Sequence, residues 1–127
     1  MIVDSDVLIW YLRGNEAAKR FVDANLPFSI SVITYMELMQ GMRSKSEMRI
    51  FQKHIHRWGI GVVHLDQDIS ARAMFYVQEY ALSHAITLAD ALIAATAVQN
   101  GETLATANDK HYKMVPSMSL KRFAPGA

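Results

Sequence analysis

Short strand-like runs that alternate with helical segments constrain this chain more than any other feature. Because two parallel strands must be joined by a crossover, usually a helix, this order predicts a parallel sheet with helices on its faces. The expected strands lie at residues 1–3, 28–33, 62–65, 103–107 and 117–123. The expected helices lie at residues 5–12 and 16–25, from 34 onward, and at 46–58, 66–84 and 87–100. The prediction is an α/β fold of three layers, in which a mainly parallel central sheet of four to five strands is flanked by helices.

The length and composition indicate one folded domain over residues 1–127. Hydrophobic residues make up 51% of the chain and charged residues 20%, a balance typical of a globular domain rather than a disordered one. The chain has no cysteine, which excludes disulfides and thiolate metal ligands. It shows no basic leader and no apolar run long enough to span a bilayer, so we expect a cytoplasmic protein without a membrane partner.

Acidic residues follow several of the expected strands. Asp4 ends the first strand, Glu37 lies one turn into the helix after the second, and Asp109 follows the fourth. Ligands of open parallel sheets bind beyond the carboxyl ends of the strands, so these acids are candidates for a binding site. Asp90 adds an acid near the start of the most apolar helix.

Each of these acids also has a purely structural interpretation. Asp4 is a favoured N-cap residue, Glu37 and Asp90 each complete the Thr-x-x-acid pattern of a capping box, and Asp109 can serve a turn. Asp90 fits this interpretation least, because its helix is apolar nearly all round and is therefore expected to be buried. A partly desolvated carboxylate needs hydrogen bonds, a cation or a proton. A shared metal ion would satisfy several of the acids together.

The types of side chain indicate which metal and which chemistry to expect. A site made only of oxygen ligands suits Mg²⁺ or Mn²⁺ better than zinc or copper. Carboxylates that hold such an ion serve phosphoryl transfer, where the ion activates water and screens the phosphate charge. Each of the five histidines is expected to be solvated or structural, so no His–Ser–Asp arrangement competes with this interpretation.

A stripe of basic residues is the charge feature that points to a nucleic acid, since the formal net charge is only +1. The stripe consists of Arg43, Lys45, Arg49, Lys53 and Arg57. It can follow a phosphate backbone, and it can equally be the solvated face of a helix.

Four segments resemble the motifs of PIN-domain nucleases, and they occur in the order of that family. They are Val3-Asp4-Ser5-Asp6-Val7-Leu8-Ile9, Ile33-Thr34-x-x-Glu37-Leu38, Leu88-Ala-Asp90-Ala-Leu-Ile-Ala-Ala95 and Leu104-Ala-Thr106-Ala-Asn108-Asp109-Lys-His-Tyr112. The resemblance spans residues 3–112, and the chain length is similar to that of the VapC-type toxins in the family. It implies a PIN-like, Rossmannoid version of the predicted α/β fold.

The resemblance also implies a site and a reaction. The residues implied to hold Mg²⁺ or Mn²⁺ and to carry catalysis are Asp4, Glu37, Asp90 and Asp109. Those implied to support the pocket are Thr106, Asn108 and Asp6, and relatives often have Asn at the last of these positions. A metal-activated water would hydrolyse RNA phosphodiesters, which makes the expected enzyme a metal-dependent endoribonuclease.

Membership of this family would bring protein partners as well. Such a toxin belongs to a type II toxin–antitoxin module of the VapBC kind, and a small antitoxin neutralises it by placing its tail in a groove beside the active site. A homodimer or a hetero-oligomer with the antitoxin is expected. Apolar residues on the early helices offer surface for partners, although core packing explains most of them equally well. These residues are Trp10, Tyr11, Leu12, Tyr35, Met36, Met39 and Met42.

Three other functions compete with this hypothesis. Asp4-Ser5-Asp6-Val7 also resembles the nucleophile motif of haloacid-dehalogenase-type phosphatases, but the later acids fit that superfamily less well. A response-regulator receiver domain has a similar size, yet Lys110 precedes His111 where that family needs proline. The third alternative is a non-catalytic PIN scaffold that binds RNA or protein. Metal-dependent cleavage of RNA, or hydrolysis of a small phosphate ester, would separate these functions.

Overall fold

The sheet of this protein has five strands in the order β3-β2-β1-β4-β5, in a computed structural model that describes residues 1–126. The strands are β1 (Ile2–Val3), β2 (Ser29–Ser31), β3 (Gly61–Val63), β4 (Leu104–Thr106) and β5 (Leu120–Arg122). Every pair of neighbouring strands in this sheet is parallel. The predicted α/β fold with a mainly parallel sheet of four to five strands is confirmed.

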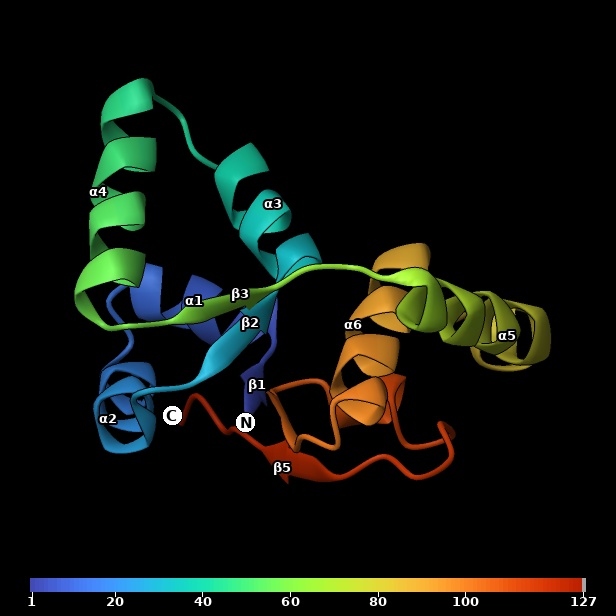
Figure 1. Cartoon of the computed structure of the whole chain (residues 1–127). Coiled ribbons are helices and arrows are strands. Elements are labelled where there is room, and N and C mark those ends of the chain that lie inside the picture. The colour runs from blue at the N-terminus through green and yellow to red at the C-terminus, as the bar shows by residue number, and fades with distance from the viewer. Residues whose placement is uncertain (127) are drawn as a thin grey trace.

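Helices cover both faces of the sheet. They are α1 (Ser5–Leu12), α2 (Glu16–Asn25), α3 (Val32–Gln40), α4 (Lys45–Arg57), α5 (Gln67–His84) and α6 (Leu88–Gln99), and a short 3₁₀ helix, η1 (Asp109–His111), follows β4. Figure 1 shows α1, α2 and α4 on one side of the strands and α5 and α6 on the other. Within residues 1–126, no helix is both long enough and apolar enough to span a membrane.

The alternation of side chains along the strands creates two hydrophobic cores. Ile2 and Leu104 pack with α5 and α6, whereas their neighbours Val3 and Ala105 pack with α1–α4. Successive residues of a strand point to opposite faces, so each central strand contributes to both cores. This explains why Ile2, Val3, Leu104 and Ala105 are all apolar, as residues of strands buried on both faces are expected to be.

The start of α3 differs from the sequence-based prediction. The alternating pattern predicted a strand over residues 28–33 and a helix from Thr34, but the strand ends at Ser31 and the helix begins at Val32. The physical reason is the cap, since the Ser31 hydroxyl accepts a hydrogen bond from the backbone N–H of Ile33 at 3.0 Å. Thr34 is therefore inside the helix and fully buried. The capping-box interpretation of Glu37 is wrong.

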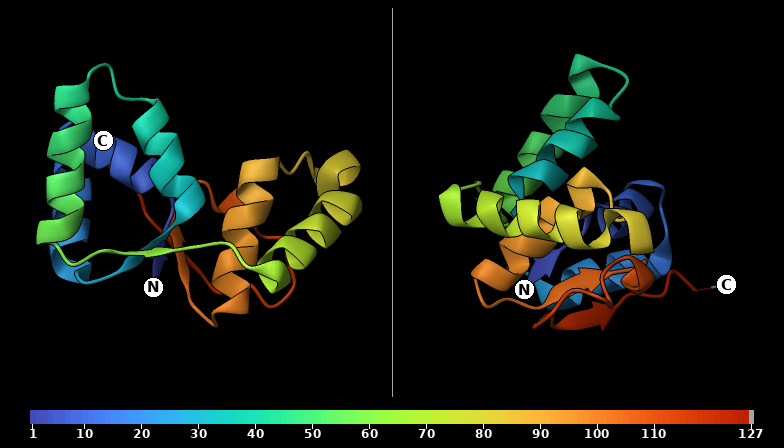
Figure 2. Two further views of the ribbon diagram at one scale, coloured as in Figure 1. Left: turned by 45° about the horizontal axis from the view of Figure 1, so that its top comes forward. Right: turned by 90° about the vertical axis from the view of Figure 1, so that its right-hand side faces the viewer.

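The helices α3 and α4 form a hairpin that projects beyond the rest of the molecule, as both views in Figure 2 show. Helix α4 is amphipathic and buries Phe51 and Ile55 in the same core as Val3. Helix α6 is buried along most of its length, as its apolar sequence predicted. This packing fixes the N-terminal end of α6, and with it the backbone of Asp90.

Candidate active site

The candidate site lies where the parallel strands end. Asp4 directly follows β1, α3 directly follows β2, and Thr106 is the last residue of β4. Because β1, β2 and β4 are adjacent and parallel, these three positions share one edge of the sheet. The first turn of α6 brings Asp90 to the same place, where its carboxylate and that of Asp4 contact one hydroxyl group.

Asp4 is buried, and polar groups surround its carboxylate. The side chain is the N-cap of α1 and accepts a hydrogen bond from the Ser5 backbone N–H at 2.8 Å, as the structural interpretation proposed. Its second oxygen accepts from the Thr106 and Tyr112 hydroxyls, each at 2.9 Å. Capping therefore accounts for one oxygen of Asp4, while the other faces the strand edge.

Three hydroxyl groups link Asp4 to three further acids, and each of them contacts Asp4 and one other carboxylate. The second contacts are Ser5 Oγ to Glu37 at 3.1 Å, Thr106 Oγ1 to Asp6 at 3.2 Å and Tyr112 Oη to Asp90 at 3.1 Å. We refer to Asp4, Asp6, Glu37 and Asp90 as the acid cluster. Each hydroxyl has a single proton, so three protons serve six contacts with carboxylates.

Asp6 connects α1 to the segment after β4. Its Oδ2 accepts hydrogen bonds from the Ala107 backbone N–H at 3.0 Å and from the Asn108 side-chain amide at 3.1 Å, in addition to Thr106. Its Oδ1 is buried and has no hydrogen-bond partner within residues 1–126. A buried carboxylate oxygen without a donor is unfavourable, so this atom is a position where a cation or water would be stabilising.

Burial dominates the electrostatics of the acid cluster, and repulsion between neighbouring carboxylates adds to it. Burial raises the pKa of Asp4 above its usual range, and nearby Asp90 adds to this against the opposing hydrogen bonds. Burial and the charge of Asp4 raise the pKa of Asp6 to about 6. Burial also raises the pKa of Glu37. Among residues 1–126 no lysine or arginine forms an ion pair with the cluster, so its negative charge is poorly compensated.

The Asp90 carboxylate contacts residues from another part of the chain in addition to its place in the capping pattern of α6. The Thr87 hydroxyl accepts from the Asp90 backbone N–H at 3.1 Å, so Thr87 caps α6 as the sequence pattern indicated. The Asp90 side chain turns away from that cap, towards Tyr112 Oη and towards His111 Nδ1 at 3.2 Å. Helical spacing around Asp90 could not reveal the contact with His111, because His111 lies in η1, beyond β4.

Asp109 lies apart from the acid cluster in its contacts. Its carboxylate is 3.4 Å from Lys113 Nζ, and none of the hydrogen bonds and ion pairs found in residues 1–126 links it to the other acids. In the same part of the chain, no three histidine, aspartate or glutamate side chains converge on a single point suited to a metal ion. The predicted convergence of Asp109 with the other acids therefore stays a prediction.

The donor set nevertheless fits a hard divalent cation. Every group around Asp4 is a carboxylate, a hydroxyl or a backbone amide, and the possible ligands are all oxygens. Such oxygens are what Mg²⁺ and Mn²⁺ prefer. The Asp6 Oδ1 atom has no hydrogen-bond partner among residues 1–126, and the pKa values of Asp4, Asp6 and Glu37 are raised. Both features favour the binding of a cation at this site.

Comparison with known proteins decides the family. Residues 1–116 match the sequence pattern of the family described as PIN domain. The chain belongs to the PIN-domain family. It is 35% identical to Ribonuclease VapC10 of Mycobacterium tuberculosis (strain CDC 1551 / Oshkosh), across 99% of this chain and 96% of that protein. The family predicted from the four motifs is confirmed.

Solved structures show the same fold. A chain of a toxin–antitoxin complex from Klebsiella pneumoniae superposes with a TM-score of 0.80 at 27% identity, covering 98% of this chain and 97% of its own. A chain of FitAcB from Neisseria gonorrhoeae superposes with a TM-score of 0.73 at 24% identity, covering 98% of this chain and 96% of its own. The second likeness concerns the fold alone.

Three residues of this PIN-domain site were not among those singled out from the sequence. Ser5 bridges Asp4 and Glu37, Tyr112 bridges Asp4 and Asp90, and His111 pairs with Asp90. Ser5 and Tyr112 lie inside the first and fourth motifs, so their position next to the acids was visible. What the sequence did not reveal is that their hydroxyls point into the cluster.

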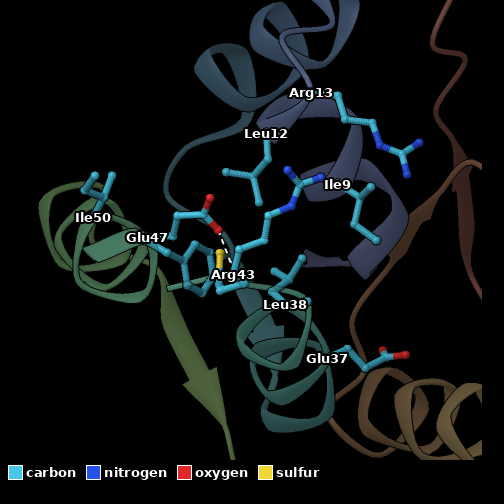
Figure 3. A pocket seen from close by; sticks show the side chains of 11 residues that line it. Ile9, Leu12, Arg13, Glu37, Leu38, Arg43, Glu47 and Ile50 are labelled. Atoms are coloured by element: carbon cyan, nitrogen blue, oxygen red, sulfur yellow. Dashed lines mark hydrogen bonds between the residues drawn. The ribbon is translucent and has the colours of Figure 1, made fainter. Parts of the chain in front are cut away.

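A groove of about 560 Å³ adjoins the site between α1, α3 and α4. Figure 3 shows Glu37 at the edge of this groove and the Arg43 side chain in its middle, near Leu12 and Ile9. The Arg43 backbone N–H donates a hydrogen bond to the Glu47 carboxylate at 2.7 Å. The apolar part of its lining consists of Ile9, Leu12, Leu38, Met42, Ile50 and Phe51. Leu12 is 47% exposed and Ile50 is 54% exposed, so the groove presents apolar surface that the described residues leave uncovered.

The basic stripe is divided between two places. Lys45, Arg49, Lys53 and Arg57 recur every four residues along α4, and all four are exposed; we call them the α4 row. At about 100° per residue they lie on one helix face, opposite the buried Phe51 and Ile55. Arg43 precedes α4 and lines the groove instead. The α4 row therefore faces away from the core side of its helix.

Proposed function

We propose that this protein is a divalent-metal-dependent endoribonuclease that serves as the toxin of a type II toxin–antitoxin pair of the VapBC kind. The observation that carries the proposal is the acid cluster at the carboxyl edge of the sheet, in a chain of the PIN-domain family. A relative of nearly equal length that is 35% identical bears the name of a ribonuclease, which supports RNA as the substrate.

The proposed metal ligands are Asp4, Glu37, Asp90 and Asp109, and the ion is Mg²⁺ or Mn²⁺. When bound, such an ion lowers the pKa of a water molecule and screens the charge of the phosphate under attack. The all-oxygen donor set and the three raised pKa values support this choice of ion. Asp109 would join the others by exchanging its contact with Lys113 for one with the ion.

Thr106, Asn108 and Asp6 keep the acids in position. The Asn108 backbone N–H donates to Thr106 Oγ1 at 3.1 Å, so the Thr106 proton points to the carboxylates of Asp4 and Asp6. Asp6 in turn holds the backbone of Ala107 and the side chain of Asn108. These bonds join α1 to the end of β4 and fix the rotamer of Asp4, a role that resembles the outer shell of a metal site.

The groove is the proposed docking surface for an antitoxin. Solved relatives are described as toxin–antitoxin complexes, and an apolar floor with Arg13 and Arg43 beside it suits a segment with apolar and acidic side chains. Such a segment would lie against Glu37 and so cover the acid cluster. We further propose that the toxin forms a homodimer or a hetero-oligomer with the antitoxin, and that it acts on RNA in the cytoplasm.

The α4 row is proposed to contact the RNA backbone away from the bond that is cut. Its four cations repeat every four residues over a helix of 13 residues, which gives an inclined row of positive charge along one side of the helix. Contacts of this kind bind phosphates without reading sequence, so they would add affinity rather than specificity.

The experiment that tests the function is cleavage of a pool of structured RNAs by the purified protein. Wild type, Asp90→Asn and Asp23→Asn are compared with Mg²⁺, with Mn²⁺ and with chelator. Asp23→Asn makes the same change of charge on the exposed face of α2 and is the matched control. We expect cleavage to require metal and to fall by at least about a hundredfold in Asp90→Asn, since loss of an outer-shell partner alone costs roughly 10–100-fold.

The alternatives give different results in the same experiment. Metal-independent cleavage, or equal cleavage by Asp90→Asn and Asp23→Asn, would remove the acid cluster from the mechanism. Intact RNA together with hydrolysis of a small phosphate ester would favour a phosphatase of the haloacid-dehalogenase type. RNA binding without hydrolysis of either substrate would favour a scaffold.

A further inference from the structure

Tyr112 brings one proton to two carboxylates at the centre of the acid cluster. Its Oη lies 2.9 Å from Asp4 Oδ2 and 3.1 Å from Asp90 Oδ1. A phenol has an ordinary pKa of about 10, so the Tyr112 hydroxyl carries its proton at neutral pH. A phenol donates a single hydrogen bond. At any moment one of the two carboxylate oxygens therefore faces the phenol oxygen without a proton from Tyr112.

The position of this hydroxyl is fixed by the fold. The Tyr112 side chain is completely buried and packs in the same core cluster as Ile2 and Val115. Its backbone is held in a turn by hydrogen bonds from the Tyr112 N–H to the Asp109 carbonyl and from the Val115 N–H to the Tyr112 carbonyl, each at 3.0 Å. The phenol cannot swing away from the acids without disturbing that packing. The core packing therefore holds the Tyr112 hydroxyl next to Asp4 and Asp90.

The two acids that Tyr112 joins come from different parts of the fold. Asp4 follows β1, whereas Asp90 belongs to the first turn of α6. The Asp90 carboxylate also contacts the exposed His111 ring at 3.2 Å, and no lysine or arginine in residues 1–126 forms an ion pair with it. The shared phenol proton thus offsets repulsion between the two carboxylates where both approach Tyr112 Oη. A divalent cation between the same carboxylates would offset that repulsion far more strongly.

We propose that the Tyr112 hydroxyl holds Asp4 and Asp90 together in the metal-free protein and that a bound divalent cation takes over this role. The inference rests on the proposed metal-dependent function and assigns Tyr112 as a positioning residue. Its hydroxyl stabilises the metal-free state more than the metal-loaded state. By linkage, removal of the hydroxyl destabilises the metal-free protein and tightens metal binding.

The test compares wild type with Tyr112→Phe and Tyr76→Phe. Tyr76 is the matched control, because it is also a buried tyrosine but its hydroxyl has no hydrogen-bond partner within residues 1–126. Thermal unfolding is measured in chelator and in Mn²⁺, and the Kd for Mn²⁺ is measured by calorimetry. These readouts do not depend on RNA cleavage.

We expect Tyr112→Phe to have a lower Tm than wild type in chelator. Addition of Mn²⁺ should raise the Tm of Tyr112→Phe by more than it raises the Tm of wild type. Its Kd for Mn²⁺ should be about fivefold to tenfold lower, since a hydrogen bond to a charged group corresponds to about a tenfold change in an equilibrium constant. Mn²⁺ should raise the Tm of Tyr76→Phe by as much as it raises the Tm of wild type. A variant at position 112 that folds only with Mn²⁺ would also support the proposal.

Other outcomes overturn it. An equal loss of Tm in chelator and in Mn²⁺ would show that the hydroxyl serves packing alone, and so would failure to fold in both conditions. Weaker Mn²⁺ binding would show that Tyr112 prepares the acids for metal rather than standing in for it. Absence of any Mn²⁺ effect on wild type is a separate result, because it would overturn the metal-dependent function itself.

Discussion

Asp6 makes the stability of the metal-free protein depend on pH in a direction opposite to that of an ordinary surface acid. Its pKa rises from 3.8 to about 6 on folding, so the folded state favours the protonated carboxyl. The stabilisation from protonated Asp6 is complete below about pH 4 and is lost as the pH rises through about 6. In the absence of metal, the charged Asp6 therefore costs stability at neutral pH.

The magnitude follows from the size of the shift. A shift of about two units corresponds to roughly 3 kcal/mol at about 1.4 kcal/mol per unit. Because Asp6 is only partly buried and water screens its charge, we expect its titration to change the free energy of unfolding by about 1–2 kcal/mol. Asp6→Asn removes this dependence, while the side-chain oxygen of asparagine can still accept from Ala107 and Asn108.

The assay is urea unfolding in chelator at about pH 4.5 and about pH 7, the window in which Asp6 titrates. When the pH is lowered, we expect the free energy of unfolding of wild type to increase by about 1–2 kcal/mol more than that of Asp6→Asn. Asp23→Asn, which removes an exposed acid from α2, should behave like wild type. Equal pH dependence in wild type and Asp6→Asn would refute the argument that burial and Asp4 raise this pKa.

Three further predictions concern other parts of the molecule. Asp109→Asn should weaken Mn²⁺ binding in calorimetry less than Asp90→Asn does, because Lys113 already compensates the Asp109 carboxylate at 3.4 Å. Phe51→Ala should lower the free energy of unfolding in urea by about 3–5 kcal/mol, because it empties a buried position between α4 and the core. Lys53→Glu should weaken RNA binding and reduce the slope of log K against log salt concentration by about 0.7 for each phosphate that the protein no longer neutralises.

Each of these has an outcome that contradicts it. An Mn²⁺ affinity lowered as much by Asp109→Asn as by Asp90→Asn would make Asp109 a full member of the metal site. For Phe51 the control is the exposed neighbour Gln52→Ala, and equal stability of the two variants would show that α4 contributes little to the fold. An unchanged salt slope in Lys53→Glu would leave the α4 row as a solvated helix face.

The sequence determined the fold and the edge of the sheet where the acids gather. Strand-like and helix-like runs alternate, and this order leads to a parallel sheet because each crossover must return the chain in the same direction. That rule assigned Asp4, Glu37 and Asp109 to one edge, and Ser5 connects the first two of them. The place of Asp109 stays a prediction. The four motifs also predicted the family correctly.

Local hydrogen bonds changed what periodicity predicted. The alternation of residues 28–33 predicted a strand two residues longer than the one observed. The Ser31 hydroxyl caps α3, so the helix begins at Val32 although the alternating pattern continues to residue 33. The same residue made the capping-box interpretation of Glu37 wrong. Capping at Thr87 was correct for the backbone and gave no information about where the Asp90 carboxylate points.

Only the tertiary structure decided how the acids are connected. The contacts of Asp4 and Asp6 with Thr106, Ala107 and Tyr112 join residues about a hundred positions apart, and no periodic pattern encodes them. They depend on how the loops after β1 and β4 pack, on side-chain rotamers, and on which hydroxyl reaches which oxygen. The sequence could place acids at one edge because backbone direction follows from the order of the elements. It could not show that one phenol proton is shared by two of them, because that depends on distances set by the whole core.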